Sequence, residues 1–121
     1  WLWGIGAAVY LSLLGPKGMV EIGEGVMQRS RYAAGRLGGI AGLSVLQADT
    51  PMFKEFVVSF EGAGKSVAEV NAALMKQDIV GGHDLSTEFS ALGQAMLVCV
   101  TEVHSKGDID ALVDAVQEAV Q

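Results

Sequence analysis

The first fourteen residues carry no charged side chain, and Gly15-Pro16 ends this apolar run. Its large apolar side chains surround most of the helix that the run would form: Trp1, Leu2, Trp3, Ile5, Val9, Tyr10, Leu11, Leu13 and Leu14. Such a helix must be covered by protein on several sides. The run is too short for a membrane span of about 20 residues, and it lacks the positive start and small-residue cleavage site of a signal peptide. We therefore expect a buried helix from a larger protein, and no membrane partner.

A second helix is predicted from Lys17 to Leu37, because apolar residues recur near the helical period and the opposite face is charged. Three glycines inside this pattern indicate either close helix packing or a marginal helix: Gly23, Gly25 and Gly35. A glycine inside a helix costs roughly 1 kcal/mol relative to alanine. Gly38-Gly39 and Gly42 mark the end of the helix. Residues 1–42 are thus predicted to form a helical lead-in.

The hydrophobic period changes at Leu43, and residues 43–121 contain four predicted strands and two predicted helices. The strands are Ser44–Leu46, Lys54–Phe60, Ile79–Val80 and Met96–Thr101, and the helices are Ser66–Lys76 and Asp108–Val120. Met96–Thr101 is apolar on both faces, which predicts a central strand. The order of elements predicts an α+β fold, in which a two-layer small domain follows the helical lead-in.

The charge and cysteine content exclude several classes of function. The formal net charge is −6 and no lysine or arginine cluster exists, so nucleic acid is not expected as a partner. The single cysteine, Cys99, excludes an internal disulfide and fits a reducing, cytoplasmic setting. Cys99 lies within an apolar strand pattern, so we expect it in the core.

The segment Glu61–Ser66 follows a strand and opens a helix, as a phosphate-binding loop does. The Walker pattern, however, requires a glycine where this chain has Ser59. Glu61 would also bring a carboxylate close to a bound phosphate. Ser66 and Glu69 instead fit a capping box at the start of the helix. We therefore predict a turn and a helix cap here rather than a nucleotide site.

No set of residues has the spacing of a catalytic or metal site. His83, Cys99 and His104 are not spaced as zinc ligands, and the apolar neighbours of Cys99 supply no base that would activate a thiol. Ser105 and Asp108 fit another helix cap. A Schiff-base lysine needs a desolvated pocket, whereas every lysine falls in a turn, a strand edge or a polar helix end: Lys17, Lys54, Lys65, Lys76 and Lys106. We predict no catalytic residue, no metal ligand and no cofactor bound by this chain.

Gly81-Gly82-His83-Asp84-Leu85 is the remaining candidate for function. Adjacent glycines let a ligand or another chain approach the backbone closely, and His83 and Asp84 could reach outward as a polar pair. A plain turn in which Asp84 bonds its own backbone explains the same residues. The sequence alone leaves both readings open.

Five segments together, in this order and spacing, resemble the C-terminal part of glycine dehydrogenase (aminomethyl-transferring) subunit 1. They are Leu2–Ile5, Tyr10–Pro16, Phe53–Val58, Gly81-Gly82-x-Asp84-Leu85 and Leu97–Glu102. This family forms half of the P-protein of the glycine cleavage system. The resemblance implies a fold-type-I pyridoxal-phosphate protein with a large domain followed by a small α+β domain. It also implies glycine decarboxylation with transfer of the aminomethyl group to the lipoyl arm of H-protein. The Schiff-base lysine of such an enzyme belongs to the large domain of subunit 2.

The resemblance implies that this chain is a fragment, inactive alone, that serves as a structural and interface domain of a glycine decarboxylase subunit. Its expected partners are the missing N-terminal large domain, subunit 2 and, through the parent complex, H-protein. Pyridoxal phosphate is expected in that complex and not on this fragment, and the exposed apolar helix predicts self-association. The candidates for an active-site rim or interface are Gly81, Gly82, His83 and Asp84. His83 stands where the family pattern has an aromatic residue. The alternative is a small regulatory module that binds an amino acid.

Overall fold

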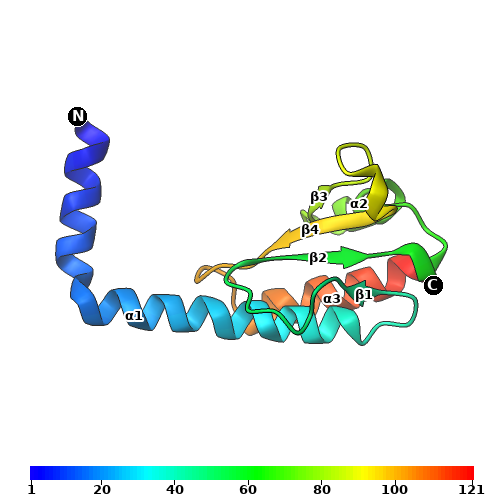
Figure 1. The fold of residues 1–121 in the computed structure, drawn as a ribbon, viewed down its shortest axis with the longest axis horizontal. Helices are drawn as coiled ribbons and strands as arrows, with labels where there is room; N and C mark the ends of the chain where they lie inside the picture. Colours follow the sequence, from blue (N-terminus) through cyan, green and yellow to red (C-terminus); the bar gives the residue numbers. More distant parts are fainter.

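The computed structural model describes all 121 residues, which form three helices and a four-stranded antiparallel sheet (Figure 1). The helices are α1 (Leu2–Gly38), α2 (Val67–Met75) and α3 (Lys106–Val120), and the strands are β1 (Ser44–Val45), β2 (Glu55–Ser59), β3 (His83–Asp84) and β4 (Ala95–Cys99). Two short 3-10 helices, Glu61–Ala63 and Ser90–Leu92, lie in the connections. The strand order is β1-β2-β4-β3. This architecture confirms the predicted α+β fold and the interior position of β4.

The long helix α1 bends sharply at Gly15, so the predicted break is confirmed. Gly15 has φ 62° and ψ −179°, a combination that only glycine adopts readily. Pro16 follows and has no backbone N–H to continue the helical hydrogen bonds. The first half of α1, Leu2–Leu14, rises away from the domain (Figure 1). We call this half, together with Trp1, the arm.

By length and composition, α1 could cross a membrane, and none of its apolar window is buried in the chain. The kink at Gly15 divides α1 into two halves that do not form one straight segment.

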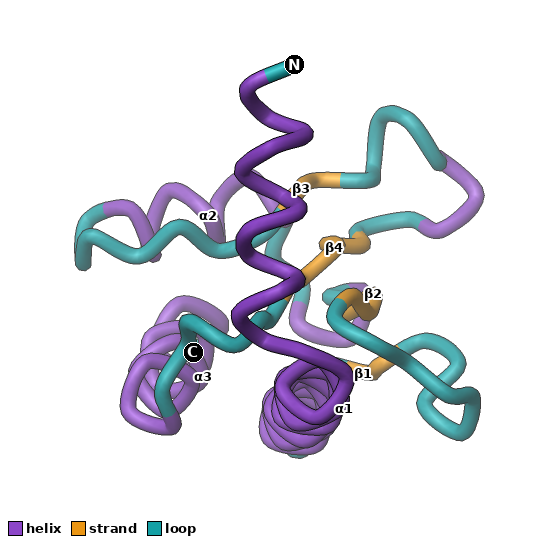
Figure 2. Tube along the Cα trace, turned by 90° about the vertical axis from the view of Figure 1, so that its left-hand side faces the viewer, coloured by secondary structure: helices purple, strands orange, loops and turns teal.

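All three helices cover one face of the sheet, which is the only face with a complete core (Figure 2). The strands contribute Phe56 and Val58 from β2 and Met96 and Val98 from β4. The helices contribute buried residues at helical spacing: Ala33, Ala34 and Leu37 from α1, Val67, Val70 and Leu74 from α2, and Ile109, Val113 and Val116 from α3. The second half of α1 is thus part of the core.

The opposite face of the sheet has no covering layer, which corrects the prediction that Cys99 is a core residue. Successive side chains of a strand point to opposite faces, and Cys99 shares its face with Leu97. Cys99 is exposed, and Leu97 and its neighbour Val57 are only half-buried. The apolar pattern correctly predicts that β4 lies inside the sheet. An interior strand, however, buries both of its faces only when a layer covers each side of the sheet.

The predicted strand Ile79–Val80 is wrong, and the neighbouring strand β3 forms four residues later. Asp78 has φ 58°, and the N–H of Ile79 still bonds the Leu74 carbonyl at 3.1 Å. These residues therefore close the C-terminal end of α2 instead of entering the sheet. The β-branched side chains favour a strand locally, but the helix end determines the backbone here.

Both predicted capping boxes are present. The Ser66 hydroxyl accepts from the Glu69 N–H at 3.2 Å, and the Glu69 carboxylate accepts from the Ser66 N–H at 2.9 Å. Ser105 and Asp108 repeat this exchange at 3.2 and 2.8 Å at the start of α3. The helix α3 accordingly begins at Lys106, two residues before the predicted start.

Candidate functional site

The Gly81–Leu85 segment enters the sheet as its edge strand, so His83 and Asp84 do not form an outward pair. His83 pairs with Leu97 and Asp84 with Met96 across β4. Neighbouring strand residues point to opposite faces. His83 therefore lies on the uncovered face of the sheet, and Asp84 lies on the face that the helices cover.

Each of these two side chains has a partner within its own segment. His83 Nε2 lies 2.9 Å from Glu88 Oε1, and both side chains are exposed. Asp84 Oδ1 accepts from the Ser86 N–H at 2.9 Å. Hydrogen bonds from Ser86 hold the pKa of the Asp84 carboxyl below its ordinary value. Asp84 thus makes the backbone contact that the plain-turn reading requires.

The two glycines are required by packing inside the domain. A Cβ on Gly82 would lie 2.4 Å from the carbonyl oxygen of Leu97 and 2.7 Å from Cγ of Met96. A Cβ on Gly81 would lie 2.4 Å from Oδ1 of Asn71 and 2.6 Å from Cδ1 of Leu74. Adjacent glycines predict that another group approaches the backbone closely, and such a group is present. It is not a ligand: the neighbours are residues of α2 and β4 in the same domain.

Asn71 is the residue of this site that sequence reasoning missed. Its Nδ2 donates to the Gly82 carbonyl at 2.9 Å, and its Oδ1 accepts from the Gly82 N–H at 3.4 Å. The side-chain amide thereby satisfies both backbone groups of Gly82. One feature of the sequence could have indicated this contact: Asn71 is a polar residue between the apolar Val70 and Leu74, on a helix that is followed by a Gly-Gly segment.

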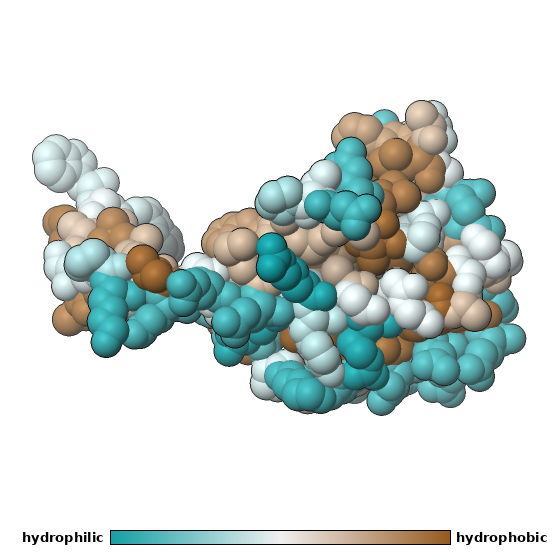
Figure 3. All heavy atoms as spheres, turned by 60° about the horizontal axis from the view of Figure 1, so that its bottom comes forward, coloured by the Kyte–Doolittle hydropathy of each residue, from teal (hydrophilic) through white to brown (hydrophobic).

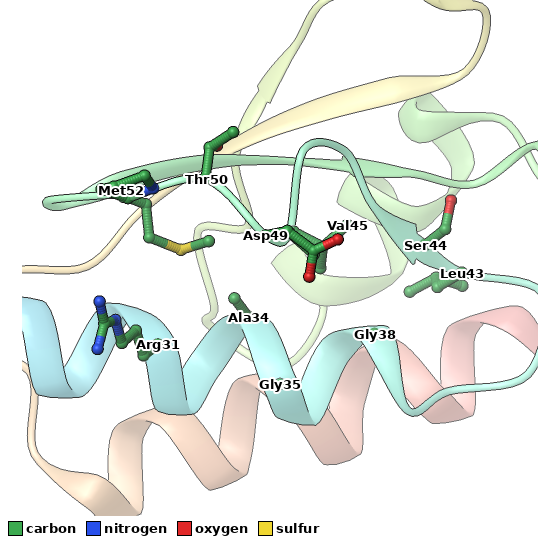
Figure 4. A pocket seen from close by; sticks show the side chains of 12 residues that line it. Arg31, Ala34, Gly35, Gly38, Leu43, Ser44, Val45, Asp49, Thr50 and Met52 are labelled. Carbon is green, nitrogen blue, oxygen red and sulfur yellow. The ribbon is translucent and has the colours of Figure 1, made fainter.

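Two open grooves flank the β1–β2 connection. The first, of about 520 Å³, lies between α1 and the β1–β2 connection (Figure 4). Arg31 projects into it from α1, and Asp49 projects from the connection toward α1 (Figure 4). The second groove, of about 620 Å³, lies over the uncovered face of the sheet between the β1–β2 connection and Leu92.

The arm is the most apolar exposed part of the chain. Its side chains lie far out on the molecule, separated from the body by the hydrophilic surface of the second half of α1 (Figure 3). Trp1 and Trp3 are almost fully exposed. Since soluble proteins rarely expose large contiguous apolar surfaces, the arm is a candidate contact surface.

The comparisons with known proteins identify the relatives of this fold. No protein-family model matches the chain. A probable glycine dehydrogenase (decarboxylating) subunit 1 from Staphylothermus marinus is 37% identical over 116 residues, which cover 96% of this chain and 24% of the relative. The protein of the same name from Saccharolobus solfataricus is 40% identical over 114 residues, which cover 94% and 23%. The chain is homologous to the C-terminal part of glycine dehydrogenase (decarboxylating) subunit 1.

A solved structure agrees with this relationship. It is the structure of a glycine decarboxylase (P-protein) of the glycine cleavage system in inhibitor-bound form. The alignment has a TM-score of 0.78 at 26% identity and covers 93% of this chain and 24% of that chain. The chain thus spans about a quarter of the length of these glycine dehydrogenase relatives.

None of the five lysines of this quarter lies where it could form a Schiff base with pyridoxal phosphate. All five lysines are exposed, and Lys106 is paired with Asp110. A Schiff-base lysine requires a desolvated pocket, and no lysine here has one. No group of three or more His, Cys, Asp or Glu side chains comes together as a metal site.

Proposed function

We propose that this chain is the C-terminal small domain of a glycine decarboxylase subunit, and that its role there is structural. The observation that carries this proposal is the match of nearly the whole chain to only a quarter of subunit 1 relatives. The exposed arm supports it, because an apolar helix without cover requires further protein. In the proposed parent, residues 1–42 lead from the large domain and residues 43–121 form the small domain.

The chemistry of the parent complex is proposed to lie outside this chain. Pyridoxal phosphate, held by subunit 2, would supply the electron sink for glycine decarboxylation, and the lipoyl arm of H-protein would receive the aminomethyl group. The exposed lysines support this assignment. We also propose a cytoplasmic location, which the single free cysteine supports.

We propose that Gly81, Gly82, His83 and Asp84 lie at the rim of the active-site cleft or at the subunit interface. The edge position of β3 supports this, since the outer side of an edge strand is free to meet another segment. The glycines would act indirectly by seating the segment against Asn71 and β4.

A chimera tests this function: the chain replaces the matched quarter of the Staphylothermus marinus subunit 1, and the subunit is assembled with its partners. We expect glycine decarboxylation to be retained. Asp84→Ala should then lower the rate more than it lowers the melting temperature, whereas Glu102→Ala, at an exposed position outside both grooves, should leave both unchanged. An inactive chimera would contradict the function, and an Asp84→Ala variant with full activity and a lowered melting temperature would reduce the segment to a turn.

A second candidate function, a regulatory module that binds an amino acid, is favoured by the groove beside α1. Arg31 and Asp49 line it without a hydrogen bond or ion pair to each other (Figure 4), and together they could bind a carboxylate and an ammonium group. Calorimetric titration of the isolated chain with glycine separates the two functions. A module should bind glycine and lose binding in Arg31→Gln, whereas a structural domain should show no heat of binding.

A further inference from the structure

The uncovered face of the sheet is a second apolar surface, separate from the arm. Leu97 and Val57 are paired across β4 and β2, and Leu46 continues the row because its N–H bonds the Val57 carbonyl at 2.9 Å. Phe53 and Leu92 border this row and are 53% and 37% exposed. These five residues line the groove of about 620 Å³, and we call them the sheet face.

The composition of the sheet face does not suit contact with water. An antiparallel sheet with one solvated face normally alternates apolar residues inside with polar residues outside. Here the central outward positions Val57, Leu97 and Ala95 are apolar, and the polar residues of this face lie at its margin: Ser44, Glu55, Ser59 and His83. The sequence of the strands is therefore that of a sheet covered on both sides.

Neither the arm of the same chain nor a second copy fits this surface well. The Gly15 kink directs the arm away from the domain (Figure 1), and the second half of α1, from which the arm extends, packs on the opposite, helical face of the sheet. A second copy would present the same acids, Glu55 and Glu88, and each copy carries a net charge of −6. Like charges that meet at an interface disfavour association.

We propose that the sheet face docks onto the portion of the subunit 1 polypeptide that lies outside the matched quarter. This inference rests on the proposed function and names the partner of the domain. The relatives are about four times as long as the matched segment, so they supply enough protein to cover it. The docking segment should have an apolar centre that fills the groove and basic residues opposite Glu55 and Glu88.

Thiol labelling tests this docking in the isolated chain and in the Staphylothermus marinus chimera. Cys99 is first replaced by serine, and single cysteines are introduced as Phe53→Cys, Leu92→Cys and, as a control on the helical side, Lys76→Cys. The two sheet-face cysteines should react with a maleimide in the isolated chain and at least about tenfold more slowly in the folded chimera. The control should react at the same rate in both.

The outcomes separate the docking from the function. A folded, active chimera in which all three cysteines react as fast as in the isolated chain would overturn the docking and leave the function standing. A chimera that does not fold or does not decarboxylate glycine would contradict the proposed function, on which the docking also rests. Protection of the sheet face in the isolated chain at high concentration, with a matching rise in sedimentation rate, would assign the face to a second copy and also overturn the proposal.

Discussion

At the scale of single residues, Gly82 is where the candidate segment depends most on its neighbours. Gly82→Ala would force a methyl group to within 2.4 Å of the Leu97 carbonyl oxygen, which belongs to the backbone of β4 and cannot move freely. We expect a loss of about 1–3 kcal/mol in the free energy of unfolding, the usual cost of overpacking. Urea unfolding of the isolated chain measures it.

Gly35→Ala is the matched control, because a Cβ at Gly35 meets no atom within 4 Å. Alanine at this position in the last turn of α1 should raise the free energy of unfolding by up to about 0.5–1 kcal/mol. If Gly82→Ala proved as stable as Gly35→Ala, the tight contact with β4 would be refuted and the Gly-Gly pair would again be free for a ligand.

The role of a residue could be predicted when its partners lie close to it in the sequence, and not when they lie far away. The Ser66 and Ser105 caps were predicted correctly because both partners lie within one helical turn. Asn71 was missed because its bonds to Gly82 span eleven residues and depend on how α2 meets the sheet. Cys99 was misplaced because its exposure is set by a missing layer, which local sequence does not record.

At the scale of elements, a polar cluster joins α1 to α3. Asp110 accepts from Tyr32 Oη at 2.6 Å and from Arg36 Nη1 at 2.7 Å, and it also pairs with Lys106. The hydrogen bond from Lys106, followed by that from Tyr32, lowers the pKa of the Asp110 carboxyl. One carboxylate therefore connects two helices that contact the same face of the sheet.

The stability of this junction should depend on pH. Because the pKa of Asp110 is lowered on folding, its stabilising effect is complete above the ordinary value near 3.8 and is lost as the pH falls through the lower folded value. Asp110→Asn should lower the urea midpoint at pH 6 and lose less stability than the parent chain between pH 4 and pH 2.

Asp114→Asn serves as the control for this experiment, since Asp114 is exposed and lies 4.0 Å from Arg36. It should follow the parent chain at every pH. A parent chain and an Asp110→Asn variant with identical pH profiles would show that the cluster contributes nothing measurable to the α1–α3 contact, as is common for exposed ion pairs.

Among the elements, those marked by helix-breaking residues or by a clear apolar pattern can be predicted from the sequence. Gly15-Pro16 located the kink of α1, and the apolar strand that became β4 was correctly placed inside the sheet. Ile79–Val80 and β3 were not, because both lie after a helix end whose geometry is fixed by Asp78 and by the contact of Gly82 with β4. In short segments such contacts outweigh β-propensity.

At the scale of the whole molecule, the chain has one closed core and two open apolar surfaces. The core joins α1, α2, α3 and one face of the sheet, whereas the arm and the sheet face have no cover in the chain. Both open surfaces fit a domain that is completed by the remaining polypeptide of its subunit. The relatives, four times as long, have that polypeptide.

The isolated chain should self-associate through the arm. Burying each large apolar side chain is worth roughly 1.5–3 kcal/mol, and the arm exposes eight such residues: Trp1, Leu2, Trp3, Ile5, Val9, Tyr10, Leu11 and Leu13. Pairing with the arm of a second copy removes part of this surface from water. Sedimentation should therefore show a concentration-dependent increase in mass for residues 1–121.

Residues 15–121 provide the comparison, because removal of the arm leaves the core intact. This shorter chain should sediment as a monomer over the same concentrations. If residues 1–121 were strictly monomeric while hydrogen exchange showed a well-ordered arm, the apolar helix would be stable in water without cover. The exposed arm would then no longer support the proposal that further polypeptide covers this domain. That proposal would rest only on the match to subunit 1.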